Sequence, residues 1–235
     1  MRRLLLMCGI LTVISVIVGA QKVSPNAEVE DEIDGFYDDS VFNASNVFVD
    51  MPAQTLDLLS TSSRLDLLDY YAADSIADVV NSMEGLSHLI PPVTDNYLKV
   101  QVTPVTSLTI KILPYGKGNI AATVYTIGDS LQAADTEIRF YDEKMVELDR
   151  SKFIKLLTTP DFFNFKGVDS ETRKALLDLV PFPTVEYILE PEGNRLQAHL
   201  TSGEFLGKET LEKIGPYLVR DRYFNWDGKK FKLLK

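Results

Sequence analysis

The sequence has one cysteine and two histidines among 235 residues, and this scarcity limits its chemistry. The cysteine, Cys8, lies inside an N-terminal apolar run, so the chain beyond that run has no disulfide and no cysteine nucleophile. Metal sites usually combine clustered histidine, cysteine and carboxylate ligands. His88 and His199 are far apart and fit no ligand motif. We therefore expect no metal, no cofactor and no catalytic residue, and the sequence disfavours an enzyme without excluding one.

Motifs for nucleophilic and phosphate chemistry are also missing. Residues 85–89, Gly-Leu-Ser-His-Leu, begin like a hydrolase nucleophile elbow but lack the final glycine, and no strand is expected to lead into them. Gly116-Lys117-Gly118 is too short for a phosphate loop and lies between two expected strands. Carboxylate pairs such as Asp66 with Asp69 leave open a hydrolase acting on glycans or peptides.

The first twenty residues have the layout of a secretory signal. Arg2 and Arg3 precede an apolar run from Leu4 to Val18, and Gly19-Ala20 supplies small residues where signal peptidase cuts. The run is shorter than the about 20 apolar residues that a membrane-spanning helix needs. We therefore expect cleavage after Ala20, no stable membrane insertion afterwards, and an exported protein. The periplasm is the first expectation, with the cell surface and the medium as alternatives.

Acidic residues outnumber basic ones, and the formal net charge of the full chain is −10. This balance disfavours nucleic acid and anionic membrane as general partners. Residues 21–46 hold seven acids between Glu28 and Asp39 and show no lasting periodicity, so we expect an acidic, disordered segment. Residues 213–235 are basic instead. That basic end is either a solvated face or a patch for an acidic partner.

From Val47 onwards the pattern predicts two successive units, residues 47–150 and 151–235. In the first unit, Asp50-Met51-Pro52 indicates the start of a helix. Apolar residues with a period of two then indicate antiparallel strands. The helices expected in this unit cover 52–60, 64–73 and, more weakly, 74–83, and its four strands are centred on 98–102, 108–112, 120–124 and 138–140.

The second unit repeats this order of elements. Helices are expected over 152–157 and after the capping residue Asp169, with a helical turn over 208–214. Strands over 185–189 and 196–200 precede a hairpin of 217–226 and 229–234, which turns at Asp227-Gly228. The predicted fold class is therefore α+β, made of two successive helix-helix-four-strand units. Helices pack on one face of antiparallel sheet, and the two halves form either one sheet or two.

The C-terminal hairpin is the surface that we expect to bind a partner. Tyrosine, tryptophan and arginine are frequent anchors of protein interfaces, and this hairpin carries Arg220, Arg222, Tyr223 and Trp226. The leading prediction is a monomeric, non-catalytic binding or structural module of a bacterial envelope, whose partner is an envelope protein or a small ligand. A carboxylate-dependent hydrolase is one alternative. An inhibitor or chaperone-like module is another, on fold-level analogy alone.

Several strings in the first unit resemble a known family. Phe48-Val49-Asp50-Met51-Pro52, the run from Arg64 to Tyr70 and the run from Asp135 to Asp142 are similar to an uncharacterised family of exported Bacteroidales proteins, a domain of unknown function. The resemblance covers most of residues 47–235. It implies a lineage and a compartment, and it carries over no catalytic residue. Bacteria of this group O-glycosylate exported proteins at Asp-Ser/Thr-apolar sites, so the resemblance also implies Ser40 as a glycosylation site.

Overall fold

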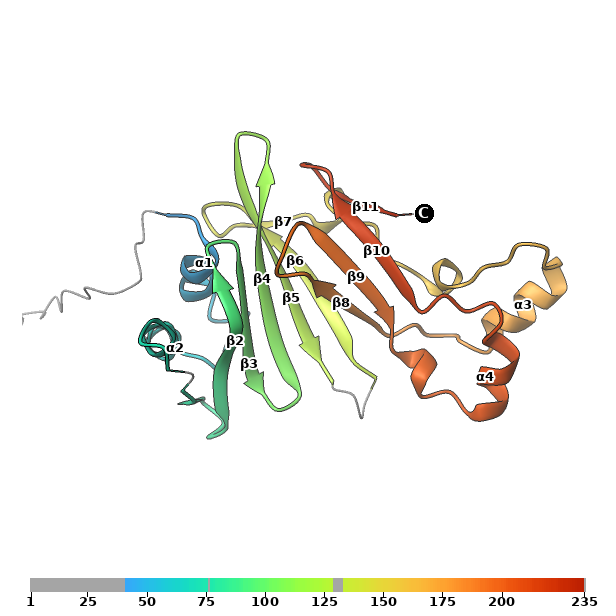
Figure 1. Ribbon diagram of the computed structural model, residues 1–235, viewed down its shortest axis with the longest axis horizontal. Helices are drawn as coiled ribbons and strands as arrows, with labels where there is room; N and C mark the ends of the chain where they lie inside the picture. Colours follow the sequence, from blue (N-terminus) through green and yellow to red (C-terminus); the bar gives the residue numbers. More distant parts are fainter. Residues whose placement is uncertain (1–40, 76, 129–132, 235) are drawn as a thin grey trace, which may run out of the picture. The chain divides into compact units, whose positions relative to one another are not determined.

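Two antiparallel sheets form the framework of the computed structural model, which describes residues 41–75, 77–128 and 133–234 (Figure 1). Among these residues, the first sheet has seven strands in the order β1-β2-β3-β4-β5-β6-β7, and the second has four in the order β11-β10-β9-β8. Every strand pairs with its neighbours in the sequence, so both sheets are meanders. The predicted α+β class is confirmed, and the two halves form two sheets.

The strands of the first sheet are β1 (Val79–Val80), β2 (Leu86–Thr94), β3 (Tyr97–Thr103), β4 (Thr106–Tyr115), β5 (Gly118–Ile127), β6 (Asp135–Tyr141) and β7 (Glu147–Leu148). Those of the second are β8 (Val185–Leu189), β9 (Arg195–Leu200), β10 (Asp221–Trp226) and β11 (Phe231–Leu233). The α-helices are α1 (Ala44–Asp50), α2 (Thr61–Ala72), α3 (Ser170–Asp178) and α4 (Lys208–Ile214). Three short 3-10 turns cover Arg150–Lys152, Thr159–Phe162 and Ser202–Glu204.

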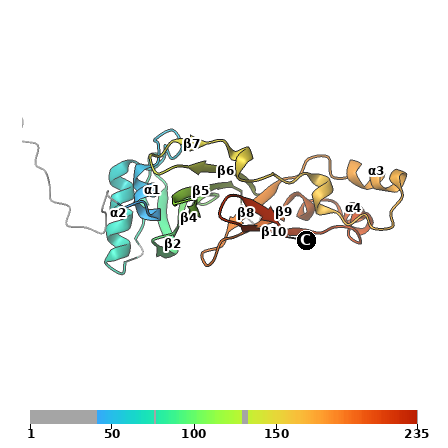
Figure 2. The same cartoon turned by 90° about the horizontal axis from the view of Figure 1, so that it is seen from above.

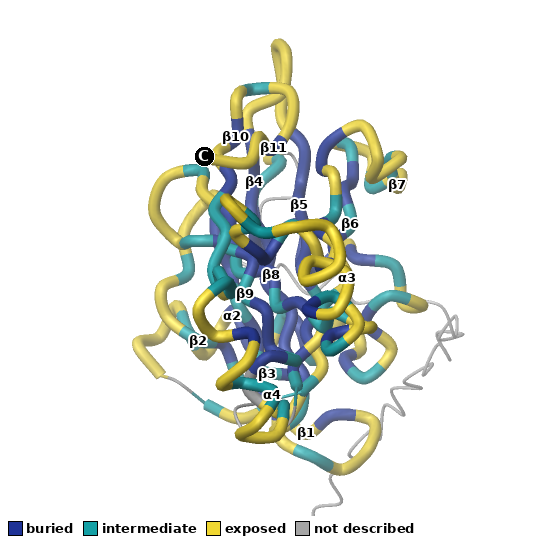
Figure 3. The backbone as a smooth tube through the Cα atoms, turned by 90° about the vertical axis from the view of Figure 1, so that its right-hand side faces the viewer, coloured by how far each residue is buried: buried dark blue, intermediate teal, exposed yellow. Residues whose placement is uncertain are grey.

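The first sheet is covered on both faces. Successive side chains of a strand point to opposite faces, so each central strand supplies two cores. Leu108 and Ile110 of β4 pack with α1 and α2. Ile120, Val124 and Phe140, on the other face, pack with the second sheet. Figure 2 shows the resulting layers, with the two helices on one side of the first sheet and β8–β10 on the other. In Figure 3 the buried residues follow the strands and the exposed ones follow the loops.

The predicted helix over 52–60 is wrong, because the helix precedes Met51 instead of following it. Asn43 caps α1, and its side-chain oxygen accepts a bond from the Asn46 amide at 2.8 Å. Order therefore begins a few residues before Val47, inside the segment that the sequence assigned to disorder. The second helix is confirmed, but Ser60 caps it and it starts at Thr61.

A buried arginine shapes the connection between these two helices. Arg64 is 2% exposed. Its guanidinium donates to the carbonyl oxygens of Val49, Met51, Leu56 and Leu59 at 2.6 to 3.0 Å. A guanidinium has five donors in a fixed fork, so one side chain can satisfy carbonyls that no helix or sheet uses. Burial lowers the pKa of Arg64, and the nearby Asp50 opposes that shift.

The first sheet has more strands than the four predicted. The expected weak helix over 74–83 is wrong, since this stretch contains β1 instead. One of the additional strands, β2, contains Pro91 and Pro92. Its pairing with β3 is irregular between Ile90 and Thr94, where those prolines lie. Proline lacks an amide hydrogen and is tolerated in a sheet at such irregularities.

In the second unit the four strands, α3 and α4 are confirmed. The predicted helix over 152–157 is wrong, because only the 3-10 turn Arg150–Lys152 forms there. Both sheets belong to one compact unit, Asp34–Lys235. The expected signal, residues 1–20, and Ser40 lie outside the described residues. Within the described part of the chain, no helix is long and apolar enough to cross a membrane.

Candidate functional site

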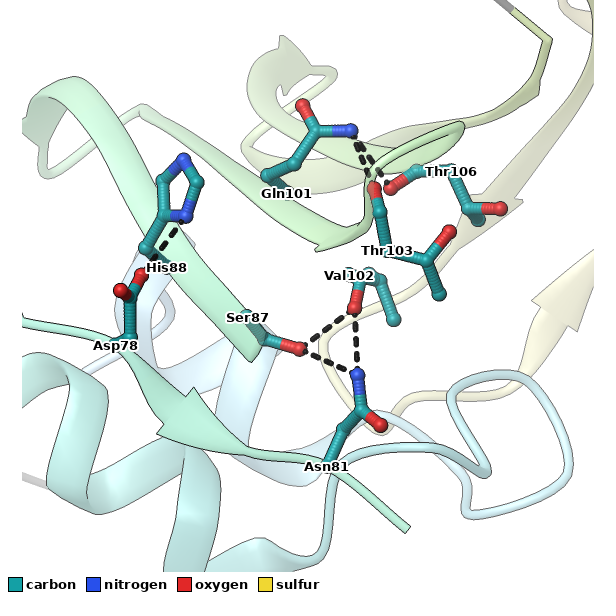
Figure 4. A network of polar contacts seen from close by, with 8 residues as sticks. All are labelled: Asp78, Asn81, Ser87, His88, Gln101, Val102, Thr103 and Thr106. Atoms are coloured by element: carbon teal, nitrogen blue, oxygen red, sulfur yellow. Dashed lines mark hydrogen bonds and ion pairs between the residues drawn. The ribbon is translucent and has the colours of Figure 1, made fainter. Parts of the chain in front are cut away.

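A polar network at the β1–β2 edge contains the residues that come nearest to a hydrolase motif (Figure 4). Ser87 is fully buried, and its hydroxyl donates to the Val102 carbonyl at 2.7 Å. Asn81 donates to both of those oxygens, at 3.1 and 2.9 Å. His88 points to the opposite face, where its Nδ1 lies 3.2 Å from Asp78. The histidine–carboxylate pair therefore does not face this hydroxyl, and Ser87 ties β2 to β3.

A second histidine–carboxylate pair lies on the outer face of the second sheet. His199 Nδ1 is 2.7 Å from Asp221 Oδ1, and Gln197 donates to the same oxygen at 2.8 Å. Burial acts to raise the pKa of Asp221, but the bonds from His199 and Gln197 outweigh it and lower that pKa. The half-buried His199 follows the polar side of β9, as its sequence position indicates. This pair joins β9 to β10.

Arg139 of β6 gathers two carboxylates beside a cavity of about 650 Å³. Its guanidinium lies 2.9 Å from Glu137 and 3.7 Å from Glu147. The bond to Glu137 raises the pKa of Arg139, and burial opposes it. Tyr141 also raises the pKa of Arg139, although its buried hydroxyl has no hydrogen-bond partner within the part of the chain that the structure describes. Both carboxylates thus contact one cation, an arrangement typical of an ion-pair network.

The structure separates Trp226 from the other hairpin residues that were expected to bind a partner. Trp226 is 5% exposed, and its indole Nε1 donates to the Pro114 carbonyl at 2.8 Å. Its ring stacks on Phe153 at 6.3 Å and meets Phe231 edge-on at 5.1 Å. Trp226 therefore fills the core between the two sheets and is not an exposed anchor.

The remaining three residues do not share one surface either. Tyr223 lies on the outer face of β10, where the Arg195 guanidinium is 4.9 Å from its ring. Arg222 lies on the inner face, and its Nε is buried without a hydrogen-bond partner among the described residues. Arg220 is exposed ahead of β10. Partner binding by these residues stays a prediction, but they do not make a single patch.

A pocket of about 450 Å³ lies between the C-terminal hairpin and the segment that follows β7. Its floor is apolar. Ile154, Leu157, Phe224 and Phe231 are buried there, and Leu233 is 37% exposed. The exposed lysines at its edge come from both walls, Lys152 and Lys155 from one and Lys230 and Lys232 from the other. We call this site the lysine-rimmed pocket.

The hairpin turn positions one wall of the lysine-rimmed pocket. Asp227 accepts bonds from the amides of Lys229 and Lys230 at 2.9 and 2.8 Å. Gly228 has a φ of +90°, which favours glycine. Beyond this turn β11 alternates lysine with an apolar residue, so Lys230 and Lys232 point away from the floor that Phe231 and Leu233 form.

The other wall is held by a capped turn and an aromatic anchor. Asp149 caps the turn Arg150–Lys152 by accepting from the Ser151 amide at 3.0 Å. Phe153 then inserts into the core, stacked on Phe140 at 4.8 Å. Its carbonyl accepts from the Phe231 amide at 2.8 Å, which ties the two walls together. The pocket is therefore built on buried elements on both sides.

The rim of the pocket is positive. Lys232 forms an ion pair with Asp227 at 2.8 Å, whereas Lys152, Lys155 and Lys230 form none with any described residue. Asp161 is the single acid among the lining residues. Its carboxylate accepts from the amide and hydroxyl of Thr158, at 2.8 and 2.9 Å. A chain of net charge −10 thus carries a local concentration of cations here.

The sequence indicates only part of this rim. The basic C-terminal stretch is either a solvated face or a patch for an acidic partner, whereas Lys152 and Lys155 fall in the predicted helix over 152–157, some 80 residues away. Only the fold brings the two segments together. The alternation of lysine with Phe231 and Leu233 was the signal that pointed to an amphipathic edge strand.

Comparison with known families places the chain. A family model described as protein of unknown function DUF3256 matches residues 41–231. The chain belongs to this family. The match runs from three residues before α1 to Phe231, the first residue of β11, so it includes β1 to β10 and the pocket wall around Lys152 and Lys155. The expected domain of unknown function is confirmed. The expected export is not tested by this match.

One solved structure, a domain of an uncharacterized protein from Porphyromonas gingivalis W83, is similar to the chain with a TM-score of 0.67. The two are 20% identical, and the similarity covers 81% of this chain and 96% of that one. At that identity it shows the fold alone. No curated protein matches the chain.

Proposed function

We propose that this protein is a non-catalytic binding module and that the lysine-rimmed pocket is its ligand site. The observation that carries the proposal is the set of four lysines around an apolar floor on an otherwise acidic chain. Such a site takes a ligand that combines an anionic group with an apolar part. Its volume of about 450 Å³ falls within the range of about 300–1,000 Å³ that is usual for ligand pockets.

Charge and burial together make the pocket prefer ligands that are both anionic and partly apolar. A unit charge pair about 4 Å apart gains roughly 1 kcal/mol in water and more where solvent is partly excluded. Apolar area removed from water adds about 25 cal/mol per Å². A ligand with both properties gains from both terms, whereas a purely polar anion gains only the first. No contact in the described residues favours the hydrolase or the inhibitor alternative.

We infer export as well, from the signal-like residues 1–20 and the Bacteroidales relationship. Cleavage of the signal tests export, and the fraction that holds the mature chain distinguishes the periplasm from the medium. Expression in a Bacteroidales host should release a protein whose N-terminus is Gln21, as determined by N-terminal sequencing of the periplasmic and culture fractions. An uncut chain that retains Met1 in the membrane fraction would contradict this expectation.

The ligand site can be tested with 1-anilinonaphthalene-8-sulfonate, an anionic aromatic probe. Trp226 is the only tryptophan and contacts Phe231 in the floor, so it reports on the pocket by energy transfer to the bound probe. We expect the double variant Lys152→Gln/Lys230→Gln to weaken probe binding about tenfold or more, since each lysine contributes roughly 1 kcal/mol.

The matched control is Lys166→Gln/Lys174→Gln, which removes two exposed lysines outside the pocket. Both double variants change the net charge equally, so a general charge effect would weaken binding in both. Equal loss in the two variants, or no loss in either, would contradict the proposal. Circular dichroism and thermal unfolding verify that each variant is folded.

A further inference from the structure

We propose that the lysine-rimmed pocket receives an acidic, extended segment of a protein partner, which pairs with the open edge of β11. This rests on the proposed function and names its ligand class. The partner segment would add a strand beside Leu233, because the Phe231 amide already donates to the Phe153 carbonyl. Addition of a strand to a sheet edge is a general mode of peptide recognition, in which backbone bonds supply affinity and side-chain pockets supply specificity.

The backbone of β11 leaves hydrogen-bonding groups on its outer side. The Leu234 amide donates to the Tyr223 carbonyl, and the Asp227 amide donates to the Lys230 carbonyl. The backbone groups of the even-numbered residues in this stretch therefore point toward β10. Residues of a strand alternate in the direction of their amide and carbonyl groups. The backbone groups of Phe231 and Leu233 therefore point away from β10, toward the edge of the sheet. The Phe231 amide donates to the Phe153 carbonyl at 2.8 Å. The Leu233 amide has no partner among the described residues, so it is available to an added strand.

The opposite edge of the same sheet, β8, has its backbone groups bonded to the first sheet. Strand addition to the second sheet is therefore expected at β11. Along β8 the Tyr187 amide donates to the Thr136 hydroxyl at 3.1 Å, and that hydroxyl donates to the Val185 carbonyl at 2.8 Å. Asp135 accepts from the Val185 amide at 3.3 Å. In the first sheet the edge strands β1 and β7 are two residues long each. Proteins usually shorten or cover sheet edges in these ways to prevent pairing.

The side chains around this edge fit an alternating acidic and apolar strand. Lysines line the rim on both sides of the edge, and Leu233 belongs to the exposed part of the floor. An added strand would direct its side chains alternately to the two faces of the sheet. Acidic residues at every second position would then meet the lysines, and apolar residues between them would meet the floor. A small anion would satisfy the lysines but leave the Leu233 amide unused.

The test uses the purified protein and a fluorescein-labelled nonapeptide of alternating glutamate and valine, with binding followed by anisotropy. A lysine–valine peptide is the charge control. A glutamate–valine peptide N-methylated at alternate residues, in both registers, is the backbone control. We expect the unmodified acidic peptide to bind at least tenfold more tightly than the lysine peptide, and at least one methylated register to lose at least tenfold. Amide hydrogen exchange at Leu233 should slow at least tenfold in the complex.

A pair of substitutions separates the backbone from the side chain at the same position. Leu233→Pro removes the outward amide hydrogen and no described hydrogen bond, and Leu233→Ala keeps that hydrogen while shortening the side chain. We expect Leu233→Pro to weaken the peptide at least tenfold more than Leu233→Ala does. Circular dichroism and thermal unfolding verify that both variants are folded.

The outcomes distinguish this inference from the proposed function. Binding of the anilinonaphthalene probe without binding of the acidic peptide would overturn the inference and leave the proposed function standing. Peptide binding that is indifferent to N-methylation and leaves Leu233 exchange unchanged would also overturn it. Preference for phosphatidylglycerol vesicles over the peptide, lost in Lys152→Gln/Lys230→Gln, would assign the pocket to a membrane surface instead. Binding of none of these probes would contradict both proposals.

Discussion

At the residue scale, the Arg64 side chain links the two segments whose sequences resemble the family. The Phe48–Pro52 string ends α1 and the Arg64–Tyr70 string lies in α2. They are joined because the Arg64 guanidinium donates to carbonyls between the two helices. A sequence motif of this kind can be recognised without alignment, but its role depends on contacts across 15 residues that periodicity does not reveal.

Replacing Arg64 by methionine should lower the free energy of unfolding by about 3 kcal/mol or more. The substitution keeps much of the buried volume but leaves several buried carbonyls without donors, each at a cost of about 1–3 kcal/mol before relaxation. Urea unfolding followed by Trp226 fluorescence measures the change. Arg173→Met, at an exposed arginine of α3, is the control and should cost below about 1 kcal/mol. A loss for Arg64→Met as small as that of the control would contradict this role.

Trp226 was expected on the surface and lies in the core, and mutation distinguishes the two. Trp226→Ala should destabilise the protein by about 3–5 kcal/mol, as a large aromatic truncation in a core does. Trp226→Phe should cost less, because it loses mainly the bond to Pro114. Differential scanning calorimetry measures both, with Tyr223→Ala on the outer face as control. Near-wild-type stability of Trp226→Ala would restore the interface interpretation.

At the scale of elements, the second sheet could be read from the sequence and the first could not in full. Strict alternation and the Asp227-Gly228 turn predicted β8 to β11 correctly, because local pattern and turn chemistry agree there. The first unit failed where tertiary contacts override the pattern. Pro91 and Pro92 are residues that disfavour a regular strand, yet the irregular part of β2 accommodates them. The pocket escaped detection because its two walls are distant in the sequence.

Asp227 in the β10–β11 turn makes the stability of the hairpin depend on pH in the acid range. Bonds from Lys232, and then from the Lys230 and Lys229 amides, hold the pKa of Asp227 below its ordinary 3.8. Because the folded pKa is lower than the unfolded one, the stabilisation is complete above about pH 4 and is lost as the pH falls through the folded pKa. Unfolding free energies measured between pH 5 and the acid limit should fall more steeply for wild type than for Asp227→Asn. Parallel curves would contradict this origin.

At the scale of the whole molecule, a buried lysine links the two sheets of the compact unit. Lys111 of β4 is 1% exposed, and its ammonium donates to the Pro191 carbonyl, in the β8–β9 turn, at 2.7 Å. It also lies 5.6 Å from the centre of the Tyr97 ring. Burial lowers the pKa of Lys111, and Glu190 opposes that shift. The core between the sheets thus contains a cation that is satisfied by both of them.

This buried lysine predicts a rise of stability with alkaline pH. Since the folded pKa lies below the unfolded 10.5, the unfolded chain holds more protons between the two values, and stability increases with pH in that window. Burial raises the pKa of Tyr97, so the tyrosine acts in the opposite direction above about pH 10. Unfolding measured up to pH 10 should therefore show the rise in wild type and not in Lys111→Met. A rise of equal size in both proteins would assign it to other groups.

The central claim, that the lysine-rimmed pocket binds an anionic partner, is tested most directly by chemical-shift mapping. Isotope-labelled protein would be titrated with the glutamate–valine nonapeptide and, separately, with 1-anilinonaphthalene-8-sulfonate. The account predicts that the largest amide shifts cluster in residues 151–157 and 230–233 for both ligands, and that Lys152→Gln/Lys230→Gln removes them. Shifts concentrated on the outer face of the second sheet, around Tyr223 and His199, or no saturable shifts with either ligand, would contradict the claim.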